Sequence, residues 1–167
     1  VRGYIRTYHD DRHKMLKYVA RRLVRPMMEG EQWVRMTTMG GFRQVGRSAT
    51  LLTTRESKVL IDCGLDPSSD ATPYFAIPEV QPLSDIDAVV ITHAHLDHCG
   101  TLPALFKYGY EGPVYCTPPT RDLMALLQLD NIKLGFGEAK KQQYEAQHVR
   151  KEILHTITIK YNETTDI

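Results

Sequence analysis

The sequence contains no apolar run long enough for a membrane-spanning helix, which needs about 18 residues. Its apolar segments are short, as in "DAVVI". The first residues, "VRGYIRTYHDDRHK", are polar and basic and do not have the pattern of a secretory signal peptide. We therefore expect no membrane contact and a cytoplasmic location.

Cysteine is also scarce: the sequence has Cys63, Cys99 and Cys116, and no Cys-x-x-Cys pair. The odd number argues against a disulfide framework and fits a reducing compartment. Cys99 lies beside a cluster of histidines, so its thiolate could serve as a zinc ligand. A small buried thiol is the commoner role for such a residue, and we favour it.

Neither sign of charge dominates the whole chain, but the charge is unevenly distributed. The net charge of +1 divides into +6 for residues 1–25, which hold eight Lys or Arg and two Asp, and −5 for the remainder. With 167 residues, of which 42% are hydrophobic and 25% charged, the chain suits one soluble domain with a short basic extension.

A basic helix is expected over residues 10–25, with Asp10 or Asp11 as its cap and Pro26 ending it. An apolar stripe recurs every four residues, at Met15, Val19 and Leu23. Lys and Arg side chains cover much of the remaining surface of this helix. They could form an ordinary solvated face, or they could contact the phosphates of a nucleic acid.

Segments typical of strands and helices alternate along the rest of the chain. The glycines of "GGFRQVG" lack the spacing of a dinucleotide-binding or phosphate-binding loop, so we interpret them as a turn. The expected strands are 32–40, 48–54, 58–64, 87–92, 112–116 and 155–161; the expected helices are 100–109, 119–129 and 138–154, and a proline-rich loop is expected over 66–85. This alternation predicts an α/β or α+β fold with a mixed sheet.

Four candidate metal ligands lie within the segment "VVITHAHLDHCG", residues 89–100. They are His93, His95, Asp97 and His98. His93 and His95 are two apart at the end of an expected strand, so an extended backbone points both to the same side. A loop at a strand end is a usual place for reactive groups. Imidazole and carboxylate ligands suit a zinc-like ion or a close pair of ions, so we predict a metal site here.

Asp62 ends another apolar strand, in "VLIDCG". Its carboxylate could orient a metal ligand without touching the metal, or it could cap a turn. We favour the first role. We do not expect His148, His155 or Asp166, which follow later in the chain, to be metal ligands.

The motif "THAHLDH" resembles the His-x-His-x-Asp-His signature of the metallo-β-lactamase fold, an αββα sandwich with a hydrolytic site of one or two zinc ions. The segments "GGFRQVGRSATLL", "LIDCGLD", "HLDHCGTLPALFKYGYEGPVYCTPPTRDLMALLQLD" and "HTITIKYNETTDI" are similar to the archaeal β-CASP ribonucleases, homologues of the cleavage and polyadenylation specificity factor endonuclease. The resemblance extends over residues 33–167.

This resemblance implies roles for single residues. Asp62 matches the family's first acidic motif, and the cluster at 93–98 matches its second. His93 and His95 would bind one zinc ion, and Asp97 and His98 would bind the other. In the family the two ions activate a water that attacks an RNA phosphodiester. Asp62 and Asp97 are the expected catalytic carboxylates.

The family's further ligands have no counterpart in this sequence, so we expect a partial αββα sandwich. Residues 1–32 would be a basic helix and linker from an upstream RNA-binding region, and 33–167 the N-terminal part of the catalytic domain. The resemblance implies a fragment of an archaeal zinc ribonuclease for RNA 3′-end processing, decay or transcription termination. By itself the fragment should bind metal weakly and be inactive. Its partner would be RNA, and the parent could be a homodimer or be completed by a second chain.

Two alternatives stay open. One is another hydrolase of the same fold, such as a thioesterase-like or lactamase-like enzyme. The other is a non-catalytic RNA-binding or assembly module that retains the motif. The basic helix and the segment "GYEGPVYCTPPTRDL" favour the ribonuclease over the other hydrolase.

Overall fold

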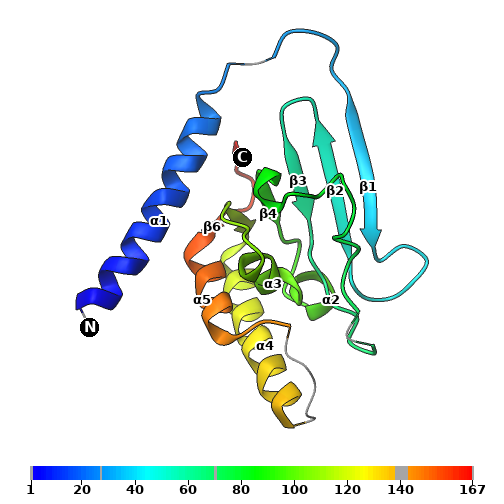
Figure 1. The fold of residues 1–167 in the computed structure, drawn as a ribbon, viewed down its shortest axis with the longest axis vertical. Coiled ribbons are helices and arrows are strands. Elements are labelled where there is room, and N and C mark those ends of the chain that lie inside the picture. Colours follow the sequence, from blue (N-terminus) through cyan, green and yellow to red (C-terminus); the bar gives the residue numbers. More distant parts are fainter. Residues whose placement is uncertain (1, 27, 70, 138–142, 167) are drawn as a thin grey trace.

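The computed structural model describes residues 2–26, 28–69, 71–137 and 143–166. Within these residues the strands form one six-stranded sheet, whose order in space follows the order in the chain (Figure 1). The strands are β1 (Val34–Gly40), β2 (Ala49–Thr54), β3 (Lys58–Ile61), β4 (Ala88–Val90), β5 (Val114–Cys116) and β6 (Thr156–Thr158). The first three run antiparallel to one another, and β3 to β6 run parallel. The predicted α/β class with a mixed sheet is confirmed.

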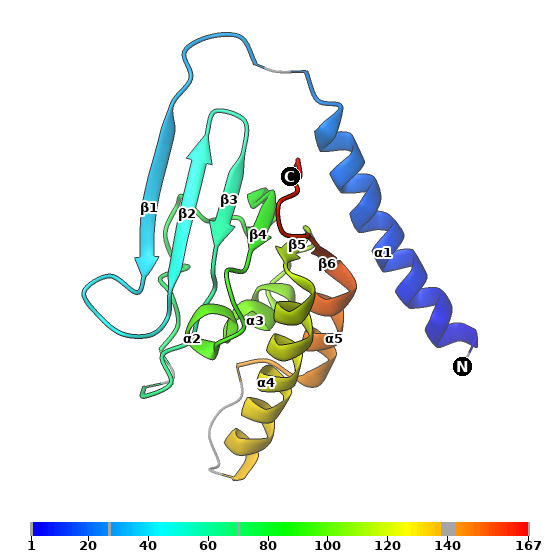
Figure 2. The same ribbon diagram turned by 180° about the vertical axis from the view of Figure 1, so that it is seen from behind.

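The helices form two groups. Helices α2 to α5 gather beside the sheet, whereas α1 runs along the outside of the molecule and contacts α5 (Figures 1 and 2). Their bounds are α1 (Arg2–Leu23), α2 (Leu96–Cys99), α3 (Leu102–Lys107), α4 (Pro118–Gly137) and α5 (Ala146–His155), with a 3-10 turn at Leu83–Asp85. No helix in the described parts of the chain is long and apolar enough to cross a membrane.

The core lies between one face of the sheet and helices α3 and α4. A row of paired apolar residues crosses four neighbouring strands, and all of its members are fully buried: Leu51, Leu60, Val89 and Val114. Leu102, Leu105 and Met124 belong to the same buried cluster. The parallel strands β4 and β5 are buried against helices. Their sequences are therefore short apolar runs with little alternation.

The opposite face of the sheet is less covered. Met36, Leu52 and Val59 form a paired row across β1, β2 and β3 on that face. Met36 is 61% exposed, while Leu52 and Val59 are half-buried. An αββα sandwich has two sheets, and the described residues supply one sheet with one layer of helices.

Several predicted helix boundaries are wrong. Helix α1 begins at Arg2 instead of residue 10, so Asp10 and Asp11 lie inside it and cap nothing. An acidic residue costs at most about 0.7 kcal/mol in an exposed helix position, which neighbouring turns easily offset. Helix α4 also continues to Gly137, past the expected end at 129.

The second half of the chain holds one further correction. Residues 138–142 of the predicted helix 138–154 lie outside the described residues, and α5 begins only at Ala146. Glu145 caps it through a reciprocal pair of hydrogen bonds, in which the Glu145 N–H donates to His148 Nδ1 at 3.0 Å. His155 ends α5 and does not open the strand, which starts at Thr156.

Helix α1 is attached to the domain mainly through polar contacts. Arg22 forms an ion pair with Asp87, whose carboxylate also accepts hydrogen bonds from Tyr18 Oη at 3.2 Å and from the Lys58 N–H at 2.8 Å. Arg12 Nη1 donates to the carbonyl oxygen of Leu154 at 2.7 Å. Of the predicted apolar stripe, only Met15 is fully buried; Val19 is half-buried, and Leu23 is 54% exposed.

Replacement of Arg22 by methionine should therefore loosen α1. The side chains of Arg22 and Asp87 are 10% and 12% exposed, so the loss of the ion pair should lower the free energy of unfolding by about 1–3 kcal/mol. Urea unfolding and the rate of proteolytic cleavage within α1 measure the effect. Arg21→Met is the matched control, because Arg21 is exposed on the same helix. Equal behaviour of the two variants would contradict the attachment by Arg22.

Candidate metal centre

The site forms where two parallel strands end side by side. Ile61 of β3 pairs with Val90 of β4, so the residues that follow these strands meet at the same edge of the sheet. The pairing continues one step further, because the N–H of Asp62 donates to the carbonyl oxygen of Val90 at 2.9 Å. Asp62 is thereby placed beside the start of the loop that carries the histidines.

The carboxylate of Asp62 is buried, with 4% of the residue exposed, and both of its oxygens are occupied. Oδ1 accepts the Thr92 N–H at 2.8 Å, and the Thr92 hydroxyl donates to the same carboxylate at 2.9–3.0 Å. Oδ2 lies 2.8 Å from Nδ1 of His98. Because a carboxylate only accepts, this contact places a proton on Nδ1; in the neutral imidazole Nε2 of His98 then carries the lone pair.

The backbone at Asp62 has a φ of 60°, in the left-handed region. Asp and Asn tolerate this region better than other side chains except glycine. The conformation turns the chain sharply after β3 and aims the carboxylate toward α2. Two residues later, a Cβ atom at Gly64 would collide with the carbonyl oxygen of Asp97, so this close approach of the loop to α2 requires glycine.

The structure brings the four predicted metal ligands together. Nε2 of His93 lies 3.1 Å from Nδ1 of His95, and the ring centres of His93 and His98 are 4.0 Å apart. Oδ2 of Asp97 lies 3.6 Å from Nε2 of His98. His95 is exposed and the other three are half-buried, so solvent can reach this cluster of imidazole and carboxylate groups.

The donor set fits a zinc-type ion in chemistry, and one contact fits it in geometry. A histidine that binds a metal through one nitrogen commonly donates its other N–H to a carboxylate, as His98 does to Asp62. With the side chains in their present positions, no group of three or more His, Cys, Asp or Glu among the described residues converges on a common point. The ring nitrogens of His93 and His95 instead face one another at hydrogen-bonding distance.

Other residues weighed as ligands lie elsewhere. The thiol of Cys99 is buried and donates to the carbonyl oxygen of Ala94 at 3.1 Å, and burial raises its pKa. This agrees with a core thiol. His148 belongs to the cap of α5, and His155 is buried with Nδ1 3.1 Å from the carbonyl oxygen of Gly112. Asp166 is exposed near the end of the described chain.

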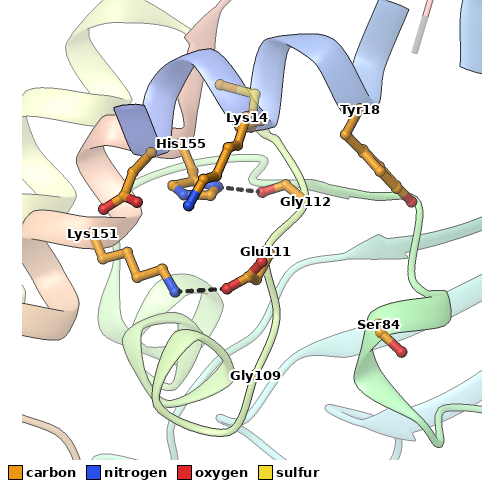
Figure 3. Close-up of a pocket in the computed structure, with 10 residues that line it drawn as sticks. Lys14, Tyr18, Ser84, Gly109, Glu111, Gly112, Lys151 and His155 are labelled. Carbon is orange, nitrogen blue, oxygen red and sulfur yellow. Dashed lines mark hydrogen bonds and ion pairs between the residues drawn. The ribbon is translucent and has the colours of Figure 1, made fainter. Parts of the chain in front are cut away.

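A cavity of about 290 Å³ lies between α1 and α5, away from the histidine cluster (Figure 3). Lys14 and Tyr18 of α1 line one side, and Lys151 and His155 of α5 line another. Lys151 Nζ pairs with Glu111 across it at 3.4 Å. The cavity therefore belongs to the contact between α1 and the domain.

The comparison with protein families decides the identity of the fold. A family model described as the metallo-beta-lactamase superfamily matches residues 43–138, more than half of the chain. The chain belongs to the metallo-β-lactamase superfamily. The resemblance drawn from its motifs is confirmed, and the match includes Asp62 and the 93–98 cluster. Members of the metallo-β-lactamase superfamily generally bind metal ions, often zinc.

Archaeal proteins are similar to this chain over its whole length. It is 55% identical to transcription termination factor FttA of Methanosarcina mazei over 169 residues, which is 100% of this chain and 26% of the relative. It is 47% identical to FttA of Methanothermobacter thermautotrophicus over 100% of this chain and 27% of the relative. It thus spans about a quarter of the length of these curated relatives. A solved structure, Rm3 metallo-beta-lactamase, has 28% identity and a TM-score of 0.38 over 52% of this chain and 30% of that chain.

Two contributors to this candidate site are missing from the sequence-based predictions. Thr92 supplies two of the donors to Asp62, yet a threonine after a strand carries no distinguishing signal. Gln128 is fully buried and its Nε2 donates to the carbonyl oxygen of Cys99 at 3.0 Å. Its signal is visible in the sequence, because it is a polar residue within the apolar run "LMALLQL".

Asp62→Ala should be strongly destabilising. It removes the acceptor of three hydrogen bonds and forces alanine into a left-handed backbone, so the free energy of unfolding should fall by about 2–4 kcal/mol. Asp62→Asn should cost less, because asparagine tolerates this backbone and keeps one acceptor oxygen. Urea unfolding compares the two variants, and NMR of the His98 ring reports whether the proton stays on Nδ1. An alanine variant as stable as the asparagine variant would contradict this role of Asp62.

Proposed function

We propose that this chain is part of a zinc-dependent ribonuclease of the β-CASP type, acting in transcription termination or in RNA 3′-end processing or decay. The observation that carries the proposal is the contact between Asp62 and His98, which leaves the outer nitrogen of that imidazole free beside two more histidines and a carboxylate. The FttA proteins are named as transcription termination factors, which supports the RNA-related role. The cytoplasm is the expected location.

Each residue of the cluster has a distinct role in this proposal. His93 and His95 would hold one ion, and Asp97 and His98 would hold a second. Bound zinc would supply Lewis acidity toward a phosphate oxygen and lower the pKa of water toward neutrality. Both carboxylate oxygens of Asp62 accept hydrogen bonds, one from Thr92 and the other from His98, so Asp62 would contribute to catalysis by orienting His98.

Helix α1 would supply a surface for RNA in this proposal. Among the basic side chains of α1 that the structure describes, Arg12 and Arg22 make polar contacts with the domain. Lys14, Lys17 and Arg21 are exposed, and Lys14 also lines the cavity between α1 and α5. Exposed cations one to two turns apart suit the repeated negative charges of a nucleic-acid backbone. The proposal assigns RNA binding to the exposed residues only.

A second candidate is a non-catalytic RNA-binding or assembly module. The observation in its favour is that the side chains of the cluster do not converge on one point in the described structure. A lactamase-like hydrolase of the same fold is distinguished from both by its substrate. Assays with RNA and with small esters or β-lactams separate the three.

Zinc binding should depend on the motif histidines. We expect the chain to bind zinc weakly, with at least about a tenfold further loss in His95→Ala, because removing even an outer support of a ligand costs about 10–100-fold. Titration of zinc against a chromophoric chelator measures this. His13→Ala, on the exposed face of α1, is the control and should bind as wild type.

The same titration can contradict the proposal in two ways. Wild-type protein that binds no zinc under these conditions would contradict the proposed zinc site. Tight stoichiometric zinc together with robust RNA cleavage by this chain would overturn the expectation that it is incomplete.

RNA binding should depend on the exposed face of α1. Simultaneous replacement of Lys14, Lys17 and Arg21 by glutamine should weaken binding to single-stranded RNA and reduce the salt dependence of log K by about 0.7 for each lost phosphate contact. Fluorescence anisotropy over a series of salt concentrations measures both. The control replaces three exposed cations elsewhere, Arg55, Lys133 and Lys160. Equal losses in the two triple variants would show that only net charge matters.

A further inference from the structure

The turn that carries Asp97 and His98 is held by an unusual set of bonds. Helix α2 has four residues, and each of its four carbonyl groups accepts a hydrogen bond from another segment of the chain. The donors are Leu65 N to Leu96 O at 2.8 Å, Ser48 N to Asp97 O at 2.8 Å, Cys63 N to His98 O at 2.7 Å, and Gln128 Nε2 to Cys99 O at 3.0 Å. Three donors are backbone groups, so Gln128 is the one side chain among them.

Gln128 is itself held by a buried acid. Its Nε2 also donates to Oε1 of Glu152 at 3.1 Å, and both residues are fully buried. The amide oxygen of Gln128, Oε1, and the second carboxyl oxygen of Glu152, Oε2, are both buried and have no hydrogen-bond partner. A buried polar atom without a partner costs about 1–3 kcal/mol, so two such atoms on one contacting pair require an explanation.

We propose that Glu152 is a neutral carboxylic acid that donates from Oε2 to Oε1 of Gln128, and that the resulting two-bond pair positions the turn carrying Asp97 and His98. A protonated carboxyl group has one O–H donor, which is the group that Gln128 Oε1 lacks. One amide hydrogen of Gln128 then serves Glu152 and the other serves Cys99, so every polar atom of both side chains is satisfied.

The surroundings of Glu152 favour the neutral form. The titratable groups that face it are Cys63 after β3, Cys99 of α2, Cys116 of β5 and Tyr144 before α5. All four are buried, burial raises the pKa of each, and none is a cation. Burial likewise raises the pKa of Glu152, and the hydrogen bond from Gln128, which lowers it, is the smaller effect.

A pH series tests the proton. Because the pKa of Glu152 is raised in the folded state, its protonation stabilises the fold fully below its ordinary pKa of about 4.5, and this stability is lost as pH rises toward the folded value. Glu152→Gln can form both hydrogen bonds without a proton that titrates. The difference in urea unfolding between the two proteins should therefore change steadily in favour of Glu152→Gln from pH 5 to pH 8. A difference that does not vary with pH would overturn the neutral acid.

Amide hydrogen exchange tests the positioning. Gln128→Met keeps the volume but removes the donor to Cys99, so exchange of the amides of residues 96–100 should quicken by about tenfold. Glu152→Gln should exchange as wild type, and Ile132→Val is the control for lost packing, because Ile132 is buried one turn further along α4. Exchange in Gln128→Met equal to that in Ile132→Val would overturn the positioning role; should Gln128→Met not fold, Gln128→Asn takes its place.

A third readout rests on the proposed function. If the cluster binds zinc, Gln128→Met should weaken zinc binding by about 10–100-fold, and Glu152→Gln should restore nearly wild-type affinity in comparison with Glu152→Leu. Wild-type protein without zinc affinity would contradict the proposed metal centre, while the exchange and pH measurements would still decide the pair. Zinc binding by the wild type and equally by Gln128→Met would contradict the pair alone.

Discussion

The buried carboxylate of Asp62 is the constraint on which the candidate site depends. It joins the end of β3 to Thr92, two residues after β4, and its contact with Nδ1 holds the His98 ring in one orientation. The same residue must adopt a left-handed backbone to do so. A strained conformation of this kind persists where the surroundings determine it fully, and such places cluster at functional sites. In this protein the determining groups are Thr92 and His98.

The loop around Asp62 also explains why the turn that carries Asp97 and His98 is supported mostly by backbone groups. The chain from Asp62 to Leu65 lies against α2 so closely that Gly64 admits no side chain, and its amides reach the carbonyl groups of α2. Backbone groups therefore carry most of the support of α2. Helix α1 is attached differently, through the ion pair of Arg22 with Asp87. The backbone amides that hold α2 carry no charge, whereas the attachment of α1 depends on a pair of charged side chains.

The sequence predicts much of this arrangement, and its failures have physical causes. Strands of β-branched and apolar residues bounded by glycine are found where expected, because burial on the helical face gives them a local signature. The motif at 93–98 is recognised because four ligand-type residues in six positions are rare by chance. The start of α5 is missed because its cap pairs Glu145 with His148, a less usual partner than glutamate.

Long-range pairings leave a weaker trace. Nothing near Thr92 indicates that its hydroxyl meets a carboxylate thirty positions earlier, and Arg22 looks like any other cation of a basic helix. Gln128 is the intermediate case. A single amide in an apolar helix indicates a buried polar residue, but it does not indicate that the partners are Cys99 and Glu152. Local patterns thus identify which residues matter, and the three-dimensional structure identifies their partners.

The order of the sheet has a consequence for how the protein is made. Each strand from β2 to β6 pairs with the strand that precedes it in the chain, so none has to be inserted between two strands already in place. Since chains emerge from the ribosome beginning with the N-terminus and fold as units during synthesis, the sheet can grow at one edge as translation proceeds. The contact between Asp62 and His98 can form once β4 and α2 have emerged, whereas Gln128 and Glu152 follow later in the chain.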